Sequence, residues 1–167
     1  MCQIARMADP RVHLIDLIKD FDTAMLATRS SDGHVRARPM AVQEVDADGD
    51  LVFCAGLDSP KIDELRQDPR VAVILQGKTK YASLSGTATV DRDRDRIHAM
   101  WKEDWKIWFP GGKDDPNLCL IDVQVTDGEY WDNSGARGVR YIVEAAKAYV
   151  KGETPQESRD QHAKVSL

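Results

Sequence analysis

The sequence has few cysteines, no long apolar run and no excess of basic residues. Its three cysteines, Cys2, Cys54 and Cys119, are odd in number and widely spaced, which argues against a disulfide framework or a C-x-x-C zinc pair. No run of about 18 apolar residues is present, so we expect no transmembrane helix. The first six residues are not followed by the apolar core of a signal peptide. These absences predict a cytoplasmic protein with reduced thiols and no membrane partner.

The charge balance argues against nucleic acid as the main partner. Lysine and arginine number 23 against 28 aspartates and glutamates, so the formal net charge is -5. A protein that binds nucleic acid through a broad surface needs a positive one. The hydrophobic fraction of 42% is too high for a disordered chain, and 167 residues suit a single domain.

Familiar catalytic and metal-binding motifs are missing. The sequence contains no G-x-S-x-G, H-E-x-x-H, Walker or G-x-G-x-x-G motif. His13, His34, His98 and His162 have no ligand spacing, and we interpret them as surface or hydrogen-bonded side chains. The acidic run over residues 46–50 does not match the spacing of an EF-hand and instead indicates a hairpin turn. No metal site is expected.

The hydrophobic pattern predicts short strands interrupted by helices. Helices are expected over residues 11–20, 59–68, 93–105 and 139–150. Strands are expected over residues 23–29, 35–45, 51–55, 70–76, 81–90, 118–126 and 128–132. Strands joined by short turns favour antiparallel pairing, so we predict a mainly β (α+β) fold, a closed or nearly closed barrel with peripheral helices. Residues 11–150 form the single domain, between an N-terminal extension (1–10) and a flexible C-terminal tail (151–167).

Two arginines on one strand are the first candidate site. Alternate residues of a strand share a face, so Arg36 and Arg38 lie on the same side of the strand over 35–45. They could belong to a solvated face with salt bridges, or they could clamp a phosphate, because guanidinium matches phosphate oxygens. Pro39 lacks an N–H group and indicates an edge or a bulge.

A helix start provides the second candidate. Ser59 suits the N-cap and Pro60 the first helical position, and Lys61 follows. Ser59 could simply cap the helix, and Lys61 could be an ordinary surface lysine. Alternatively, the hydroxyl, the ammonium group and the free N–H groups of the helix could bind an anion. The hairpin over residues 35–55 brings Arg38 towards this helix start, so the two candidates support each other.

The third candidate is a set of aromatic residues. Trp101 and Trp105 have helical spacing and are expected to pack in a core. Trp108 and Trp131 adjoin loops and could border a flat heteroaromatic ligand, or they could simply pack.

Taken together, five segments resemble the split-barrel flavoproteins related to pyridoxamine 5′-phosphate oxidase, in particular the general stress protein 26 branch. They are VRARPM (35–40), LVFCAGLDSPKIDELRQDPRVAVIL (51–75), YASLSGTATV (81–90), WFPGGKDDPNLCLIDV (108–123) and EYWD (129–132). The resemblance covers residues 11–150. It implies an antiparallel split β-barrel of the FMN-binding type and a homodimer with FMN at the subunit interface.

The resemblance also assigns residues to the cofactor. Residues of the second strand and its neighbour would approach the flavin ring: Arg38, Pro39, Met40, Ala41, Phe53, Cys54 and Ala55. Ser59 and Lys61 would bind the phosphate. Other residues, partly from the second subunit, would complete the pocket: Tyr81, Ser83, Trp108, Tyr130 and Trp131.

Three departures from the true oxidases concern the substrate. Pro60 replaces an arginine, Gln43 replaces a lysine for the substrate phosphate, and residues 132–138 do not reproduce the R-x-H motif. The resemblance therefore implies flavin binding without pyridoxamine phosphate oxidation. Two functions stay open, a flavin-dependent oxidoreductase or reductase and a non-catalytic protein that stores, carries or senses flavin. FAD, the deazaflavin F420 or a haem could occupy the same cleft instead of FMN.

Overall fold

The protein, described here from a computed structural model, is a β-barrel with helices at both ends. The structure describes residues 9–155, 158 and 161–167. The helices are α1 (Pro10–Ile18), α2 (Pro60–Gln67), α3 (Arg94–Met100) and α4 (Gly135–Lys151), with short 3-10 turns η1 (Glu103–Ile107) and η2 (Gly112–Asp114). The strands are β1 (Thr23–Arg29), β2 (Val35–Val45), β3 (Leu51–Gly56), β4 (Arg70–Gln76), β5 (Lys80–Asp91), β6 (Leu118–Asp132) and β7 (His162–Ser166).

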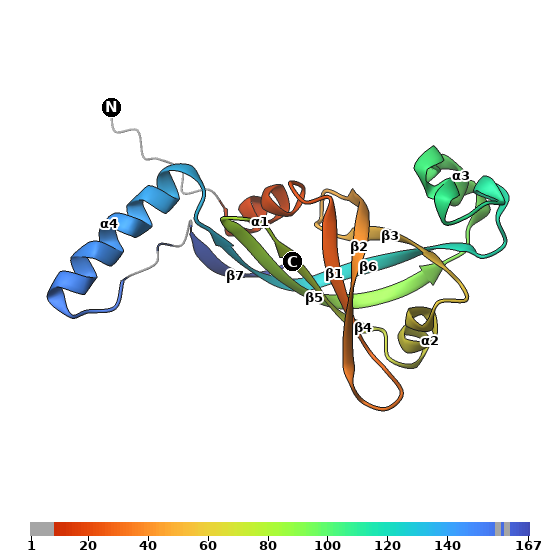
Figure 1. The fold of residues 1–167 in the computed structure, drawn as a ribbon, viewed down its shortest axis with the longest axis horizontal. Coiled ribbons are helices and arrows are strands. Elements are labelled where there is room, and N and C mark those ends of the chain that lie inside the picture. The colour runs from red at the N-terminus through yellow and green to blue at the C-terminus, as the bar shows by residue number, and fades with distance from the viewer. Residues whose placement is uncertain (1–8, 156–157, 159–160) are drawn as a thin grey trace.

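The predicted antiparallel barrel is confirmed. The strand order is β3-β2-β1-β4-β5-β6-β7, and an additional pairing between β3 and β6 closes the barrel. Every described pairing is antiparallel. The alternating pattern places one face of each strand inside, where side chains such as Leu26, Phe53 and Leu84 are fully buried. Figure 1 shows α3 at one end of the barrel and α4 at the other.

The long strands β5 and β6 bend around the barrel at a bulge. Their register shifts between Ser85 and Gly86, as the glycine within this strand predicts. A Cβ atom at Gly86 would lie 2.1 Å from the carbonyl oxygen of Gln124, so a side chain cannot be accommodated there without a backbone shift. The two strands expected over 118–126 and 128–132 form one continuous strand, β6.

The helix expected over residues 93–105 is shorter than predicted. Asp93 caps α3 by accepting hydrogen bonds from two backbone N–H groups, but the helix ends at Met100 because Trp101 leaves the helical region. The chain then re-forms a turn in η1, which contains Trp105. Conversely, α4 begins at Gly135, four residues before the expected start.

The prediction of a flexible C-terminal tail is wrong for residues 162–166. These residues form β7, which pairs with β6 from Trp131↔His162 to Asp127↔Ser166. Ala163 and Val165 pack against the core, so the segment gains both hydrogen bonds and apolar contacts. It covers an edge of β6 that would otherwise be unpaired. Of the expected N-terminal extension, residues 1–8 lie outside the described residues, and α1 begins at Pro10.

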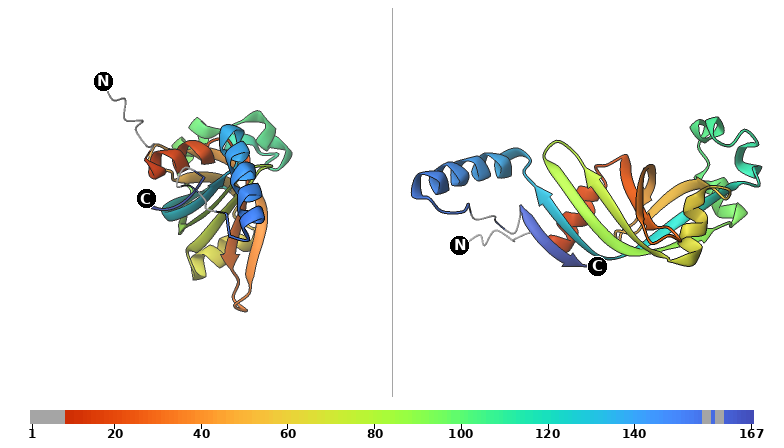
Figure 2. Two further views of the ribbon diagram at one scale, coloured as in Figure 1. Left: turned by 90° about the vertical axis from the view of Figure 1, so that its left-hand side faces the viewer. Right: turned by 60° about the horizontal axis from the view of Figure 1, so that its bottom comes forward.

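Two further views show how the helices sit. Figure 2 shows α4 extending away from the barrel, with α3 and the following turns at the opposite end. No helix among the described residues has the length and apolar content needed to cross a membrane.

Candidate functional site

A cleft opens where β2 and β3 separate. β2 pairs with β1 over Val35–Ala41, and it pairs with β3 only over Val42–Val45. β3 continues along β6 as far as Gly56. In the described part of the chain, no strand therefore pairs with the other edge of β2 at Pro39–Ala41, and the gap between the two strands leaves room for a ligand.

The cleft has a volume of about 440 Å³, a size typical of sites for small molecules. It is lined by residues from β2, β3, α2 and the η1 region: Pro39, Met40, Ala41, Gln43, Cys54, Ala55, Gly56, Lys61, Asp104, Trp105, Trp108 and Phe109. The structure thus brings together seven of the residues singled out in the sequence: Pro39, Met40, Ala41, Cys54, Ala55, Lys61 and Trp108.

One end of the cleft is formed by the start of α2. Ser59 is the N-cap residue, and its hydroxyl donates to the carbonyl oxygen of Gly56 at 2.6 Å instead of capping the helix. Lys61 lines the cleft and makes no hydrogen bond or salt bridge to any residue that the structure describes. Burial lowers the pKa of Lys61, and the positive charge of Arg38 lowers it further. A half-buried cation without a partner favours an anionic ligand.

Arg38 does not line the cleft, but its charge acts on Lys61. Its guanidinium donates to the Glu64 carboxylate at 2.8 Å, to the Thr28 hydroxyl at 2.5 Å and to the carbonyl oxygen of Leu26 at 3.3 Å. Arg36, two residues earlier on the same face, is exposed and pairs with Asp32 in the β1–β2 turn at 3.0 Å. The structure therefore separates two arginines that strand alternation alone could not distinguish.

Besides Arg38 and Ser59, five predicted site residues do not line this cleft. The side chain of Phe53 is fully buried in the core, as is that of Tyr130. Tyr81, Ser83 and Trp131 lie on β5 and β6, where Tyr81 is directly opposite Trp131. None of these three lines the cleft that contains Lys61.

Glu64 was not predicted as a component of this region, whereas Gln43 was noted only as a departure from the true oxidases. Gln43 lines the cleft, and its side-chain oxygen accepts hydrogen bonds from Lys102 at 3.0 Å and Trp105 at 3.2 Å. Glu64 is buried on α2. One signal was available for Glu64, because it follows Lys61 by three residues and so shares its helix face.

The two described thiols are poor nucleophiles. Burial raises the pKa of Cys54 to about 12 and that of Cys119 to about 11. The thiol of Cys119 donates to the carbonyl oxygen of Ala55 at 3.3 Å. Since the thiolate is the reactive form, a raised pKa keeps both thiols protonated. Cys119 is fully buried, whereas Cys54 is partly buried and lines the cleft.

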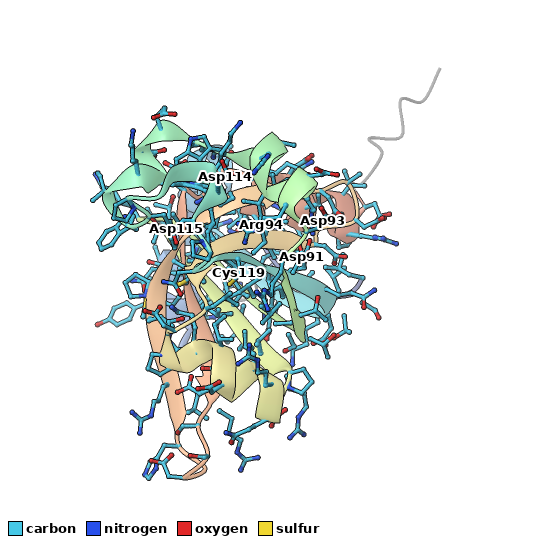
Figure 3. The ribbon with its side chains drawn as sticks, turned by 90° about the vertical axis from the view of Figure 1, so that its right-hand side faces the viewer. Asp91, Asp93, Arg94, Asp114, Asp115 and Cys119 are labelled. Atoms are coloured by element: carbon cyan, nitrogen blue, oxygen red, sulfur yellow. The ribbon has the colours of Figure 1, made fainter. Side chains whose placement is uncertain are left out.

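The end of the barrel beside the cleft is held by a polar cluster (Figure 3). Arg94 donates to the carbonyl oxygens of Asp115 and Leu118 at 3.0 and 2.8 Å, which fastens α3 to the chain entering β6. Asp91 pairs with Arg96, and Asp114 pairs with His98. Within the described ranges, no group of acidic, histidine or cysteine side chains is arranged to hold a metal ion.

Comparison with known proteins identifies relatives that share this barrel. A Jannaschia sp. CCS1 protein described as a general stress protein 26 is 27% identical, with a TM-score of 0.73 over 96% of this chain and 100% of that one. The general stress FMN/FAD binding protein of Xanthomonas citri is 30% identical, with a TM-score of 0.64 over 75% of this chain and 90% of that one.

The curated relatives are matched over only part of their length. Protein bli-3 of Neurospora crassa is 31% identical over 119 residues, which are 64% of this chain and 57% of that protein. The chain spans between 40% and 57% of the length of the curated relatives that it matches. The family model described as pyridoxamine 5′-phosphate oxidase like matches residues 9–156. The resemblance deduced from the sequence is therefore confirmed, and the chain belongs to the pyridoxamine 5′-phosphate oxidase-like family.

Proposed function

We propose that this protein is a homodimeric, FMN-dependent oxidoreductase that binds the flavin in the cleft between β2 and β3. The observation that carries the proposal is the unpaired, half-buried Lys61 at the start of α2, which faces an apolar cleft. A phosphate there would meet an ammonium group, a nearby guanidinium and the partial positive charge of a helix start. The flavin-binding name of the Xanthomonas citri relative supports the same cofactor class.

The residues present fit a flavin mononucleotide. Its phosphate matches Lys61 at the start of α2, where Ser59 is the N-cap residue but does not itself line the cleft. The ring and ribityl chain match the apolar walls formed by Met40, Ala55 and Trp108. The edge of β2 at Pro39–Ala41 offers backbone groups that no described strand uses, and such groups can orient a polar heterocycle. When bound, the flavin supplies the redox chemistry, and the protein supplies binding, orientation and exclusion of water.

A second copy of the chain would complete the site. Tyr81, Ser83 and Trp131 lie on the outside of β5 and β6, away from the cleft of their own chain. Trp108 is 77% exposed at the cleft, and Met25 on the outer sheet face is 38% exposed. Dimerisation would cover such apolar side chains and could add an aromatic wall to the partner's cleft.

The expected substrate is not pyridoxamine phosphate. Gln43 is neutral where the true oxidases place a lysine, and its side-chain oxygen is already engaged by Lys102 and Trp105. The alternative function is a flavin-binding stress protein without turnover, which the general stress names of the relatives favour.

The test is to purify the protein and identify what it binds. We expect a flavin absorption spectrum and release of FMN on denaturation, identified by mass. Protein lacking the cofactor is then titrated with FMN, FAD, riboflavin, F420 and haem. Steady NAD(P)H oxidation with FMN would support the enzyme, whereas tight binding without turnover of any donor would support storage or sensing. Absence of binding to any flavin would overturn both.

A further inference from the structure

Glu64 is a buried carboxylate for which the family comparison gives no role. Its side chain, on the barrel side of α2, is only 9% exposed. Its Oε2 atom accepts hydrogen bonds from the Thr28 hydroxyl at 2.5 Å and from Arg38 at 2.8 Å. Burying a charge is costly unless it is paired, so this carboxylate and the Arg38 guanidinium depend on each other.

The contacts fix the guanidinium of Arg38 from one side. Leu26 is the cross-strand neighbour of Arg38, and its carbonyl oxygen and the Thr28 hydroxyl both accept from Nη1. Glu64 accepts from Nη2. An arginine side chain has several rotatable bonds and explores many positions unless it is held. Here a hydroxyl, a backbone carbonyl and a carboxylate together fix the side chain of Arg38.

Lys61 and Glu64 are three residues apart on α2, so they share one face of the helix. The bond to Glu64 therefore holds Arg38 next to Lys61, and the mutual repulsion of these two cations contributes to the lowered pKa of Lys61. Glu64 is committed to Arg38, Asp58 acts on Lys61 only through its charge, and Asp104 also lines the cleft. The Lys61 ammonium group is therefore left with a positive charge and no hydrogen-bonded carboxylate among the residues that the structure describes. An incoming phosphate group would compensate this charge.

We propose that Glu64 is a positioning residue that holds Arg38 beside Lys61 and thereby creates the preference of the cleft for phosphorylated flavin. This inference rests on the proposed function, because it assumes that the cleft binds FMN. It assigns to Glu64 no contact with the ligand. If Glu64 acts only through Arg38, its removal has no further effect once Arg38 is gone.

The experiment compares FMN with riboflavin, which lacks the phosphate, by fluorescence titration of protein freed of cofactor. We expect Glu64→Gln to weaken FMN binding about tenfold and riboflavin binding much less. The reason is that Arg38 loses its charged partner and is no longer held where its positive charge favours the phosphate. The matched control is Asp63→Asn. Asp63 is the preceding residue, is exposed, and pairs with Arg66 at 3.0 Å on the outer side of α2. This control is expected to leave both affinities unchanged.

A double-mutant cycle with Arg38→Met separates positioning from general stability. In the Arg38→Met background, adding Glu64→Met should not change the ratio of FMN to riboflavin affinity. The double variant also removes both buried charges at once, so it is expected to fold even if the single Glu64 variant does not. The folded state is checked by thermal melts without ligand.

Two results would overturn the inference. One is that Glu64→Gln keeps the wild-type preference for FMN over riboflavin, whereas Arg38→Met loses this preference. The other is a further loss of preference on adding Glu64→Met to Arg38→Met. A wild-type protein that binds FMN and riboflavin equally would overturn the phosphate site, and the role of Glu64 with it. A wild-type protein that binds neither would instead refute the proposed function.

Discussion

At the level of single side chains, the residues that line the cleft differ from those that hold the charged groups near it. Lys61 is the cation that lines the cleft, whereas Arg38 does not line it and is held by Glu64 and Thr28. The positive charge that lines the cleft therefore lies at the start of α2, the end expected to bind phosphate. The apolar residues along the rest of the cleft need no charged partner.

Replacing Lys61 by alanine should weaken FMN more than riboflavin. A charge-assisted hydrogen bond contributes about 1.5–3 kcal/mol, so the loss for FMN is expected to be about tenfold or more. Fluorescence titration of both ligands measures the difference. Lys106→Ala, an exposed lysine in η1, is the control and should change neither affinity. Equal losses of FMN and riboflavin in Lys61→Ala would remove Lys61 from the phosphate site.

The preference for FMN should also depend on pH. Burial and Arg38 lower the pKa of Lys61, so in the unliganded protein its charge is lost before the ordinary lysine pKa of about 10.4 is reached. We expect the ratio of FMN to riboflavin affinity to fall as the pH rises into this range. In Lys61→Arg the ratio should persist to higher pH, because arginine stays protonated. A flat profile for the wild-type protein would contradict this assignment.

Arg38→Ala should impair flavin binding more than Arg36→Ala. Arg38 is held beside the cleft by buried partners, whereas Arg36 makes an exposed pair with Asp32, which stabilises little. The expected loss for Arg38 is about tenfold in affinity, or about 1.4 kcal/mol. Thermal melts without ligand verify that both variants are folded. A larger effect for Arg36 would show that this strand face does not serve the cleft.

At the level of helices and strands, the bulge between β5 and β6 sets the curvature of the barrel wall. Gly86→Ala should be strongly destabilising, by about 2 kcal/mol or more, because its Cβ would overlap the carbonyl oxygen of Gln124. Urea unfolding measures the difference. At Gly77, the nearest atom to a new Cβ is 3.4 Å away, so Gly77→Ala is the control and should cost much less. Equal stability of the two variants would mean that the strands can shift at little cost.

The sequence allowed prediction of most elements because their signals are local. Ser59 and Pro60 mark the start of α2, and alternation along residues 35–45 identified which side chains share a face of β2. β7 was missed because its five residues have a weak pattern and gain their stability from β6, about thirty positions earlier. The Arg38–Glu64 pair was missed for the same reason, since its partners come from separate elements.

For the whole molecule, dimerisation would bring together aromatic side chains and a cleft that one chain keeps apart. Light scattering should therefore give twice the 18.7 kDa mass of the chain. Met25→Asp should shift the protein towards monomer and weaken flavin binding, because Met25 lies between Pro39 and Ile74 on the outer sheet face. Val12→Asp, an exposed site on α1, is the control. A monomer that binds FMN fully would refute the shared site.

The pairing of β3 with β6 has a consequence for how the chain folds during synthesis. Phe53 and Ile121 are cross-strand neighbours, so the barrel cannot close until the ribosome has released β6. Until then β1–β5 form an open sheet with an unpaired edge on β3, the kind of edge that attracts other strands. Pairing of residues so far apart is also slow. A high expression level is therefore expected to favour aggregation of incomplete chains, and a lower expression level, with fewer incomplete chains present at one time, should raise the fraction of folded protein.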